Sequence, residues 1–297
     1  MMTISEALKS KDEYYERSTH TEDEDFRFTE ALGFLIEETK DPQYMTELAW
    51  HYCHNKRFDL EIKYLEMAAE LGDSSACEEL GYMWYYGQHG EQDYEKAYKY
   101  FSIGASDEKG EGSLWCKYKL ADMYHHGCYV EKDDEKYRQM IEEAYEKVKN
   151  PKYTNEPFPE IAYRLAGIRT EEGKKNEALD LLYNAKTFMT QRLYYAAFWG
   201  HIEVMGRIVR SLYELTGFNE EGFDLYDIFY LEKRPGKITF RKDDKKYTIK
   251  ISEEDNAIHF DGKWYRNFLE FCEKAVIDGE KITSLYYDLY DFKEEEE

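Results

Sequence analysis

Two short stretches of the chain gather the residue types that bind zinc. One is "MYHHGCY", with His125, His126 and Cys128, and the other is "WHYCHN", with His51, Cys53 and His54. Zinc takes neutral imidazole or thiolate ligands in tetrahedral geometry, usually four of them. Both stretches also fit the last turn of a helix, where imidazolium is favoured by the helix dipole. We therefore predict no metal and no other cofactor.

Other residue patterns that could carry catalysis give no specific signal. The sequence has no GxSxG, HExxH, phosphate-binding glycine loop or dinucleotide-binding fingerprint. Paired carboxylates occur throughout, so that no single pair stands out as an acid and base. Cys116 and Cys128 would be nucleophiles only beside a base and an oxyanion site, which nothing in the sequence places near them. We predict a protein that is not an enzyme and has no small-molecule substrate.

Composition and charge narrow the possible partners. The 297 residues include 63 acidic and 40 basic side chains, for a formal net charge of −23. Because phosphate contacts need clustered Lys and Arg, this charge makes nucleic acid an unlikely general partner. It suits solubility, a basic protein partner, or mimicry of a nucleic acid.

Cysteine usage and hydropathy indicate a cytoplasmic location. The five cysteines are odd in number, scattered and without a CxxC pair, which favours reduced thiols. No apolar run reaches the roughly 18 residues of a membrane span. The N-terminal stretch is polar and acidic, unlike a secretory signal peptide. We expect no membrane contact.

An internal repeat organises the first two thirds of the chain. With an offset of 40, "LGYMWYYGQHGEQDYEKA" from Leu80 lies over "LADMYHHGCYVEKDDEKY" from Leu120 without a gap. An earlier copy starts at Leu48 with "LAWHYCHN", and a later one starts at Leu165 with "LAGIRTEEGKKNEALDLLYNA". Tyr52, Trp84 and Tyr124 share the aromatic place in the first three copies.

The spacing within each copy predicts a helix, a turn and a second helix. Leu80, Met83 and Trp84 lie on one helical face, which predicts that Trp84 is a core residue. Gly87 and Gly127 follow the first helices, where a left-handed residue is expected, and Asn55 can serve there as well. A second apolar stripe follows, at positions 94, 97, 98, 101 and 105. A single pair cannot bury its apolar face, so neighbouring pairs are expected to stack.

The residues that join two copies resemble Sel-one-like repeats. "AAELGDSSACEELGYMWYYG" matches that family's pattern at positions 68, 69, 72, 76, 80, 81, 84 and 87, and "DYEKAYKYF" continues it. The copy from Leu165 is similar to a tetratricopeptide repeat. The resemblance covers roughly residues 40 to 190, and it implies a mostly α fold, a right-handed α-solenoid of helix-turn-helix repeats. Tyr137, Arg169 and the long turn "SDEKGEGSLWCK" at 106–117 depart from the pattern.

The resemblance also implies a binding surface. In such arrays the first helix of each pair lines a concave groove that binds peptides or protein surfaces. Mapped onto this sequence, the groove residues are Trp50, Cys53, His54, Tyr82, Tyr85, Tyr86, Tyr118, Asp122, His125 and His126. Tyrosine and tryptophan are favoured at interfaces. The alternative is that these side chains contact the second helices or each other.

The C-terminal part has a different pattern. Alternation at 238 and 240, and again at 247, 249 and 251, predicts two strands joined at Asp243-Asp244. A third strand at 258–260 turns at Asp261-Gly262 into a return strand that begins at Trp264. The spacing of 267–277 predicts a helix. The hairpin is locally basic, which leaves a nucleic-acid contact open, although lysines at a sheet edge are more often solubilising: Lys237, Arg241, Lys242, Lys245, Lys246 and Lys250.

The sequence thus predicts four segments: a helical repeat domain at 1–222, a linker at 223–235, a small α+β domain at 236–293 and a disordered acidic tail at 294–297. Within the repeat domain, 25–39 reads as a helix and 190–215 as a helix pair broken at Gly200. The predicted function is a non-catalytic scaffold or adaptor that binds a protein or peptide. The alternative is an acidic inhibitor or immunity-type protein that caps a basic partner such as a nuclease, and could mimic DNA.

Overall fold

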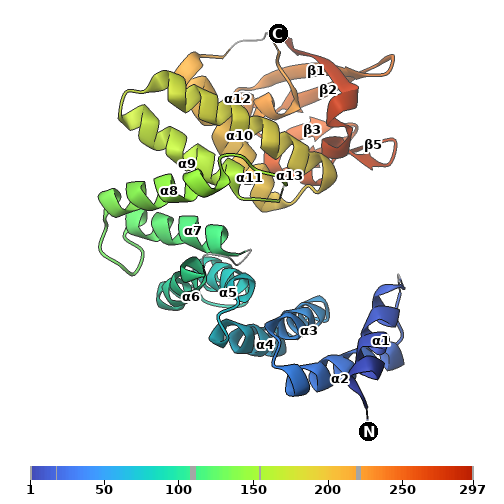
Figure 1. The fold of residues 1–297 in the computed structure, drawn as a ribbon. Helices are drawn as coiled ribbons and strands as arrows, with labels where there is room; N and C mark the ends of the chain where they lie inside the picture. The colour runs from blue at the N-terminus through green and yellow to red at the C-terminus, as the bar shows by residue number, and fades with distance from the viewer. Residues whose placement is uncertain (1, 18, 108–111, 154, 219–221, 296–297) are drawn as a thin grey trace. The chain divides into compact units, whose positions relative to one another are not determined.

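A computed structural model describes residues 2–17, 19–107, 112–153, 155–218 and 222–295. The chain divides into two compact units, Met1–Ala144 and Tyr145–Glu297, which we describe separately (Figure 1). The predicted long turn at 106–117 falls partly outside the described residues. Among the helices described, none combines the length and the apolar character needed to cross a membrane.

The first unit consists of helices joined by short turns. These are α1 (Ile4–Tyr15), α2 (Glu22–Thr39), α3 (Pro42–His54), α4 (Phe58–Glu70), α5 (Ser74–Tyr86), α6 (Tyr94–Ser106), α7 (Ser113–His126) and the start of α8 (Asp134–Val148). Polar side chains fix several helix starts: Asp41, Asp73 and Asp93 each accept a hydrogen bond from a backbone N–H of the first turn. The predicted helices α2 to α7 are confirmed, and α1 is an addition to them.

The turns after α5 and α7 repeat one backbone geometry. Gly87 and Gly127 are both left-handed, with φ of 65° and 69°. The N–H of Asp93 donates to the carbonyl of Trp84, and the N–H of Asp133 donates to that of Tyr124, both at 2.9 Å. The prediction for Asn55 is wrong. Asn55 has a φ of −85° and its side chain donates to the carbonyl of His51, so the next residue, Lys56, takes the left-handed conformation instead.

A side chain twelve residues further on covers the repeated aromatic place in the copies that begin at Leu48, Leu80 and Leu120. Tyr64 stacks on Tyr52 with ring centroids 5.7 Å apart. Lys96 places its ammonium 3.7 Å from the centroid of the Trp84 ring, and Lys136 lies 4.0 Å from that of Tyr124. We call these three contacts the clamps. Trp84 is therefore half-buried beneath a lysine, rather than a full core residue like Leu80 and Met83.

Small residues allow the helices of the first unit to approach closely. A Cβ on Gly81 would lie 2.3 Å from the Phe101 ring, so α5 can contact α6 at this point only without a side chain. A Cβ on Gly104 would meet the Cys116 sulfur at 2.4 Å. These approaches explain why small residues recur in the pattern of the repeats.

The second unit contains three long helices, α9 (Phe158–Glu171), α10 (Lys175–Tyr195) and α11 (Trp199–Thr216). The predicted helix pair is present, but its break lies at 196–198 rather than at Gly200. The helix α10 ends at Tyr195, and α11 begins at Trp199. Two buried ion pairs hold this unit together. Arg192 contacts Glu160 at 2.6 Å, and Lys186 contacts Asp227 at 2.5 Å.

The sequence predicts a linker at 223–235, but these residues belong to the folded unit. They form the short helices η1 (Leu225–Asp227) and α12 (Ile228–Leu231). The apolar side chains at 223, 225, 226, 228, 229 and 231 are buried, because they supply core between the helices and the sheet of this unit. The helices α9 to α11 also belong to this unit rather than to the first, so the domain boundary differs from the predicted one at 222.

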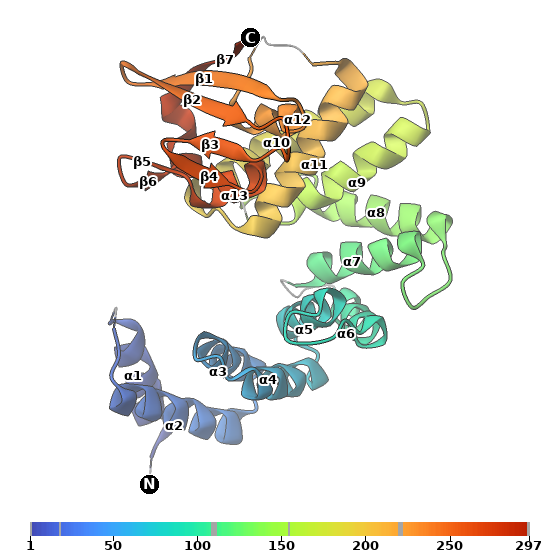
Figure 2. The ribbon, with the colours of Figure 1, turned by 180° about the vertical axis from the view of Figure 1, so that it is seen from behind.

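The sheet has five strands in the order β4-β3-β2-β1-β7, and Figure 2 shows β1 to β4 side by side. The strands are β1 (Gly236–Lys242), β2 (Lys245–Ile251), β3 (Ile258–Phe260), β4 (Lys263–Tyr265) and β7 (Leu289–Glu295). Around them lie α13 (Phe268–Lys274), β5 (Val276–Ile277), β6 (Glu280–Lys281) and η2 (Ile282–Asp288). The predicted hairpins and the helix after Asn267 are confirmed.

One prediction about the C-terminus is wrong. Glu294 and Glu295 belong to β7 and pair with Ile238 and Lys237 of β1, so they are not part of a disordered tail. Residues 296–297 lie outside the described residues. The pairing was hidden because β7 has an irregular register: a bulge opposite Phe240 breaks the alternation that marks a strand.

Candidate functional site

The predicted groove tyrosines of α5 surround a lysine of the same chain. Lys119 of α7 is 3% exposed, and its ammonium lies 4.0 Å from the Tyr85 ring centroid, 4.9 Å from that of Tyr86 and 5.6 Å from that of Tyr82. It also donates to the Tyr86 hydroxyl at 3.0 Å. We call these four residues the Lys119 cage. Aromatic rings stabilise a desolvated cation through their negative faces.

Two further predicted groove residues support the cage from α7. Asp122 is 6% exposed and places a carboxylate oxygen 3.7 Å from the Lys119 nitrogen. Tyr118 is 4% exposed, and its hydroxyl contacts that of Tyr82. The prediction that Tyr118 and Asp122 line an open groove is therefore wrong. Successive first helices contact each other here, and polar side chains between them satisfy one another.

Four of the predicted groove residues remain open to solvent. Trp50 is 53% exposed and Tyr86 is 48% exposed, and His54 and His126 are exposed as well. His54, Tyr86 and His126 are the last residues of α3, α5 and α7, at equivalent places in three successive copies. We call Trp50, His54, Tyr86 and His126 the exposed row.

The histidines of the exposed row cap helix ends. The Nδ1 of His54 donates to the carbonyl of Trp50, and the Nδ1 of His126 donates to that of Asp122, both at 2.8 Å. His125 is half-buried, stacks on Tyr137 and bonds to Asp134 through Nδ1 at 2.8 Å. These bonds leave the Nε2 atoms of His54 and His126 available to a partner.

Four of the five cysteines are poorly suited to nucleophilic chemistry. Burial, with Glu61 beside the thiol, raises the pKa of Cys53 to about 11. Burial raises the pKa of Cys77 to about 12, and it also raises the pKa values of Cys116 and Cys272. A thiol with a raised pKa holds little of the reactive thiolate at neutral pH. Within the described residues, no three His, Cys, Asp or Glu side chains gather in a way that could hold a metal ion.

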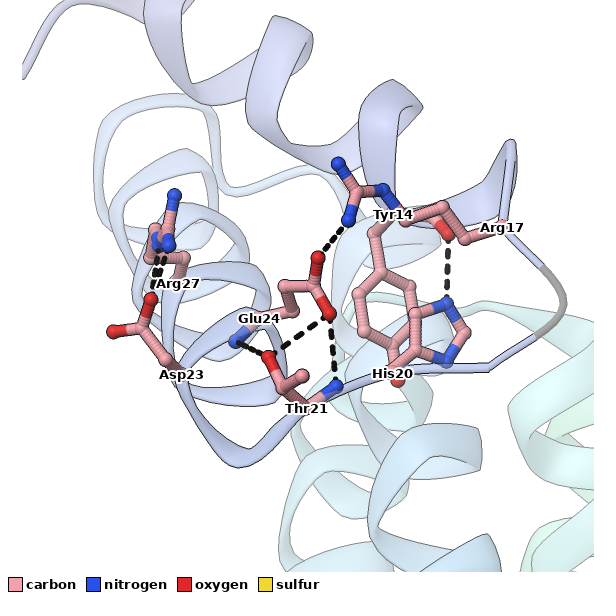
Figure 3. Close-up of polar contacts among 7 residues, drawn as sticks. All are labelled: Tyr14, Arg17, His20, Thr21, Asp23, Glu24 and Arg27. Atoms are coloured by element: carbon pink, nitrogen blue, oxygen red, sulfur yellow. Dashed lines mark hydrogen bonds and ion pairs between the residues drawn. The ribbon is translucent and has the colours of Figure 1, made fainter.

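A polar network in the α1–α2 hairpin was not found from the sequence. Figure 3 shows His20 lying over the Tyr14 ring, with centroids 3.7 Å apart, while Glu24 and Thr21 cap the start of α2. The Tyr14 hydroxyl donates to Asp25 at 2.6 Å, and burial, together with this carboxylate, raises the pKa of Tyr14. The spacing Thr21-x-x-Glu24 was the available signal, since it is a capping box.

Two arginines of this hairpin pair with carboxylates at the start of α2. Arg17 pairs with Glu24, and Arg27 pairs with Asp23. A hollow of about 40 Å³ lies between the helices, lined in part by Tyr14, Arg17 and Glu24. Such a volume suits water rather than a ligand of any size. We interpret the network as one that holds α1 on α2.

Comparison with known proteins returns structures of helical repeat proteins. No family model matches the chain, and no curated protein matches it. A Sel1 repeat protein from Oxalobacter formigenes is 16% identical over 70% of this chain and 79% of its own, with a TM-score of 0.47. Pseudomonas aeruginosa PilF is 14% identical over 76% and 97%, with a TM-score of 0.42, and yeast Tom70 is 17% identical over 78% and 53%, with a TM-score of 0.35.

The chain's own geometry defines its class more directly. The clamp recurs at the same interval in the copies that begin at Leu48, Leu80 and Leu120, and the turn and the aspartate cap recur in the last two of them. The chain is a helical repeat protein with a Sel-one-like and tetratricopeptide-like pattern, followed by a small sheet region.

Proposed function

We propose that the chain is a non-catalytic scaffold that binds a protein or peptide through the exposed row. The observation that carries this proposal is the equivalence of His54, Tyr86 and His126. Each ends a first helix, and each leaves an aromatic ring in solvent at the same place of its repeat. Trp50 adds a large ring one turn before His54. Aromatic side chains that recur on one side of a repeat array suit a partner that runs along it.

The absence of catalysis is part of this proposal. The raised pKa values of Cys53 and Cys77 support it, because these thiols hold little thiolate, and so does His125, whose imidazole already contacts Asp134 and Tyr137. A basic partner would suit the net charge of −23, and a cytoplasmic location would suit the free cysteines.

A capture experiment tests the proposal. The full chain and a Trp50→Ala/His54→Ala/Tyr86→Ala/His126→Ala variant are used as baits in extracts of the source cell. We expect the variant to lose the partners that the parent chain retains. A matched control replaces exposed aromatic residues outside the row, Phe26, Tyr153 and Tyr183, with alanine.

The control should recover the same partners as the parent chain, and circular dichroism should show all three proteins folded. Equal recovery by the row variant would reject the exposed row as the binding surface. The capture is repeated at rising salt concentration. A partner bound by the acidic surface, as in the inhibitor alternative, should be lost steeply as salt rises, because salt screens exposed charges.

A further inference from the structure

The outer face of the five-stranded sheet gathers basic side chains in a strongly acidic protein. Strand register places Lys237 opposite Lys250, Lys250 opposite His259, and His259 opposite Trp264. A parallel row places Arg241 opposite Lys246. The first row runs across β1 to β4 and the second across β1 and β2, on the same face.

Burial shows which side of the sheet this face is. The alternate residues Ile238, Phe240 and Ile249 are buried, so their side chains form the core. Lys237, Lys250 and Trp264 are exposed, and Trp264 is 65% exposed. The basic rows therefore lie on the solvent face of the sheet, and the opposite face is the apolar one that contacts α13.

The arrangement of the cations is unfavourable for the isolated sheet. Like charges directly opposite each other on neighbouring strands are destabilising, and this face contains two such pairs, Lys237 with Lys250 and Arg241 with Lys246. Glu295 of β7 lies opposite Lys237 and contacts Lys246 at 2.5 Å, so it compensates part of both pairs. A bound polyanion would relieve the remaining repulsion.

An aromatic platform continues the first row. The Trp264 ring lies 4.9 Å from that of His259, measured between centroids. An exposed tryptophan beside surface lysines is the combination that binds single-stranded nucleic acid: rings stack on bases, and ammonium groups contact phosphates. An acidic protein segment would use the lysines but would gain little from the tryptophan.

We propose that this face binds a short single-stranded nucleic acid, with phosphates on Lys237, Lys250 and Arg241 and a base stacked on Trp264. The negative net charge does not oppose this locally, since exposed charges are screened beyond about 8 Å at physiological salt. The acidic turns at 243–244 and 253–255, at the ends of the strands, confine the site to the sheet face. The site shares no residue with the exposed row.

Fluorescence anisotropy of the full chain tests the proposal. The probes are 5′-fluorescein-labelled dT12 and rU12, titrated in 25 mM and 200 mM NaCl. We expect saturable binding at the lower salt and weaker binding at the higher salt, because phosphate contacts release counterions. No rise in anisotropy up to 100 µM protein in 25 mM NaCl would overturn the proposal.

Two variants place the binding on the sheet face. Lys237→Glu/Lys250→Glu should weaken binding at least tenfold and lower the salt dependence by about 0.7 for each lost contact. Trp264→Ala should weaken binding at least fivefold, as expected for the loss of one stacked base. The control Lys175→Glu/Lys281→Glu changes the charge equally at exposed positions elsewhere in the same unit and should bind as the parent chain does.

The two variants also separate the alternatives. A loss for the charge variant with none for Trp264→Ala, together with full competition by poly-glutamate, would assign the face to an acidic protein segment and overturn the nucleic-acid proposal. Equal weakening by the control variant would show that binding depends only on net charge, and this would also overturn the proposal. Far-UV circular dichroism confirms that each variant is folded, and each replaced side chain is exposed.

Discussion

The copies at 80–105 and 120–144 have the same backbone plan but differ in the side chains that complete it. Both turn through a left-handed glycine, both begin the second helix at an aspartate cap, and both clamp an aromatic ring under a lysine. Yet Gly81 and Phe101 stand where the second copy has Ala121 and Ile141. The smaller residue is paired with the larger one in each copy, so the two copies conserve the combined side-chain volume at this contact rather than each side chain.

The greatest difference between the copies is the polarity of one position. Glu79 in the first copy is exposed, whereas its counterpart Lys119 is buried in the cage. Tyrosines of one copy therefore hold a cation of the next, and the repeats are joined by a polar contact as well as by apolar packing. Variants that remove this contact, the Gly81–Phe101 approach or a clamp show how much each contributes to the free energy of unfolding.

The largest effect should come from Lys119→Ala. The change removes one charge partner of the buried Asp122 and empties the space between the three rings, so we expect a loss of about 3 kcal/mol in the free energy of unfolding. Urea denaturation followed by circular dichroism measures it. Lys117→Ala on the same helix removes a contact with the half-exposed Glu143 and should cost under about 1 kcal/mol. Equal losses for the two variants would contradict the cage.

A smaller effect is expected for Gly81→Ala, about 2 kcal/mol, because the new Cβ would overlap the Phe101 ring. The second copy suggests the remedy. Gly81→Ala/Phe101→Ile reproduces the pair found at Ala121 and Ile141 and should recover much of the loss. A double variant that is less stable than Gly81→Ala would show that the two positions do not compensate.

The smallest effect should separate the two lysine clamps. Lys96→Met and Lys136→Met keep the aliphatic stem but remove the charge above Trp84 and Tyr124, which should cost about 0.5–1 kcal/mol each. Lys136 also donates to the Tyr124 hydroxyl at 2.8 Å, so its loss should be the greater. Thermal unfolding of both variants against the parent chain checks the order, and a larger loss for Lys96→Met would contradict it.

Sequence patterns predicted the features that depend on neighbours along the chain. These features are local: the helical spacing, the left-handed glycines at 87 and 127, and the alternation of β1 and β2. The structure confirms each of them. Lys119 was missed because a lysine ordinarily faces water, and only three tyrosines from another helix make its burial favourable. The strand β7 was missed for a similar reason, since its bulge and its acidic end hide a pairing with a strand far away in sequence.

Which of the predicted groove residues are exposed could be predicted only in part, for the same reason. The family pattern identified the first helices as a surface, and Trp50, His54, Tyr86 and His126 are indeed exposed on them. It could not separate these from Tyr118 and Asp122, because helical position alone does not reveal whether the next repeat covers a side chain.

Hydroxyl-radical footprinting of the full chain, alone and with its captured partner, tests the central claim most directly. Alone, Trp50 and Tyr86 should be oxidised rapidly because they are exposed, while Tyr82 and Tyr118 should be protected where their hydroxyls meet between α5 and α7. With the partner bound, we expect Trp50 and Tyr86 to become protected at least severalfold and Phe26 to stay unchanged. Unchanged oxidation of Trp50 and Tyr86 in a complex that is otherwise intact would contradict the exposed row as the binding surface.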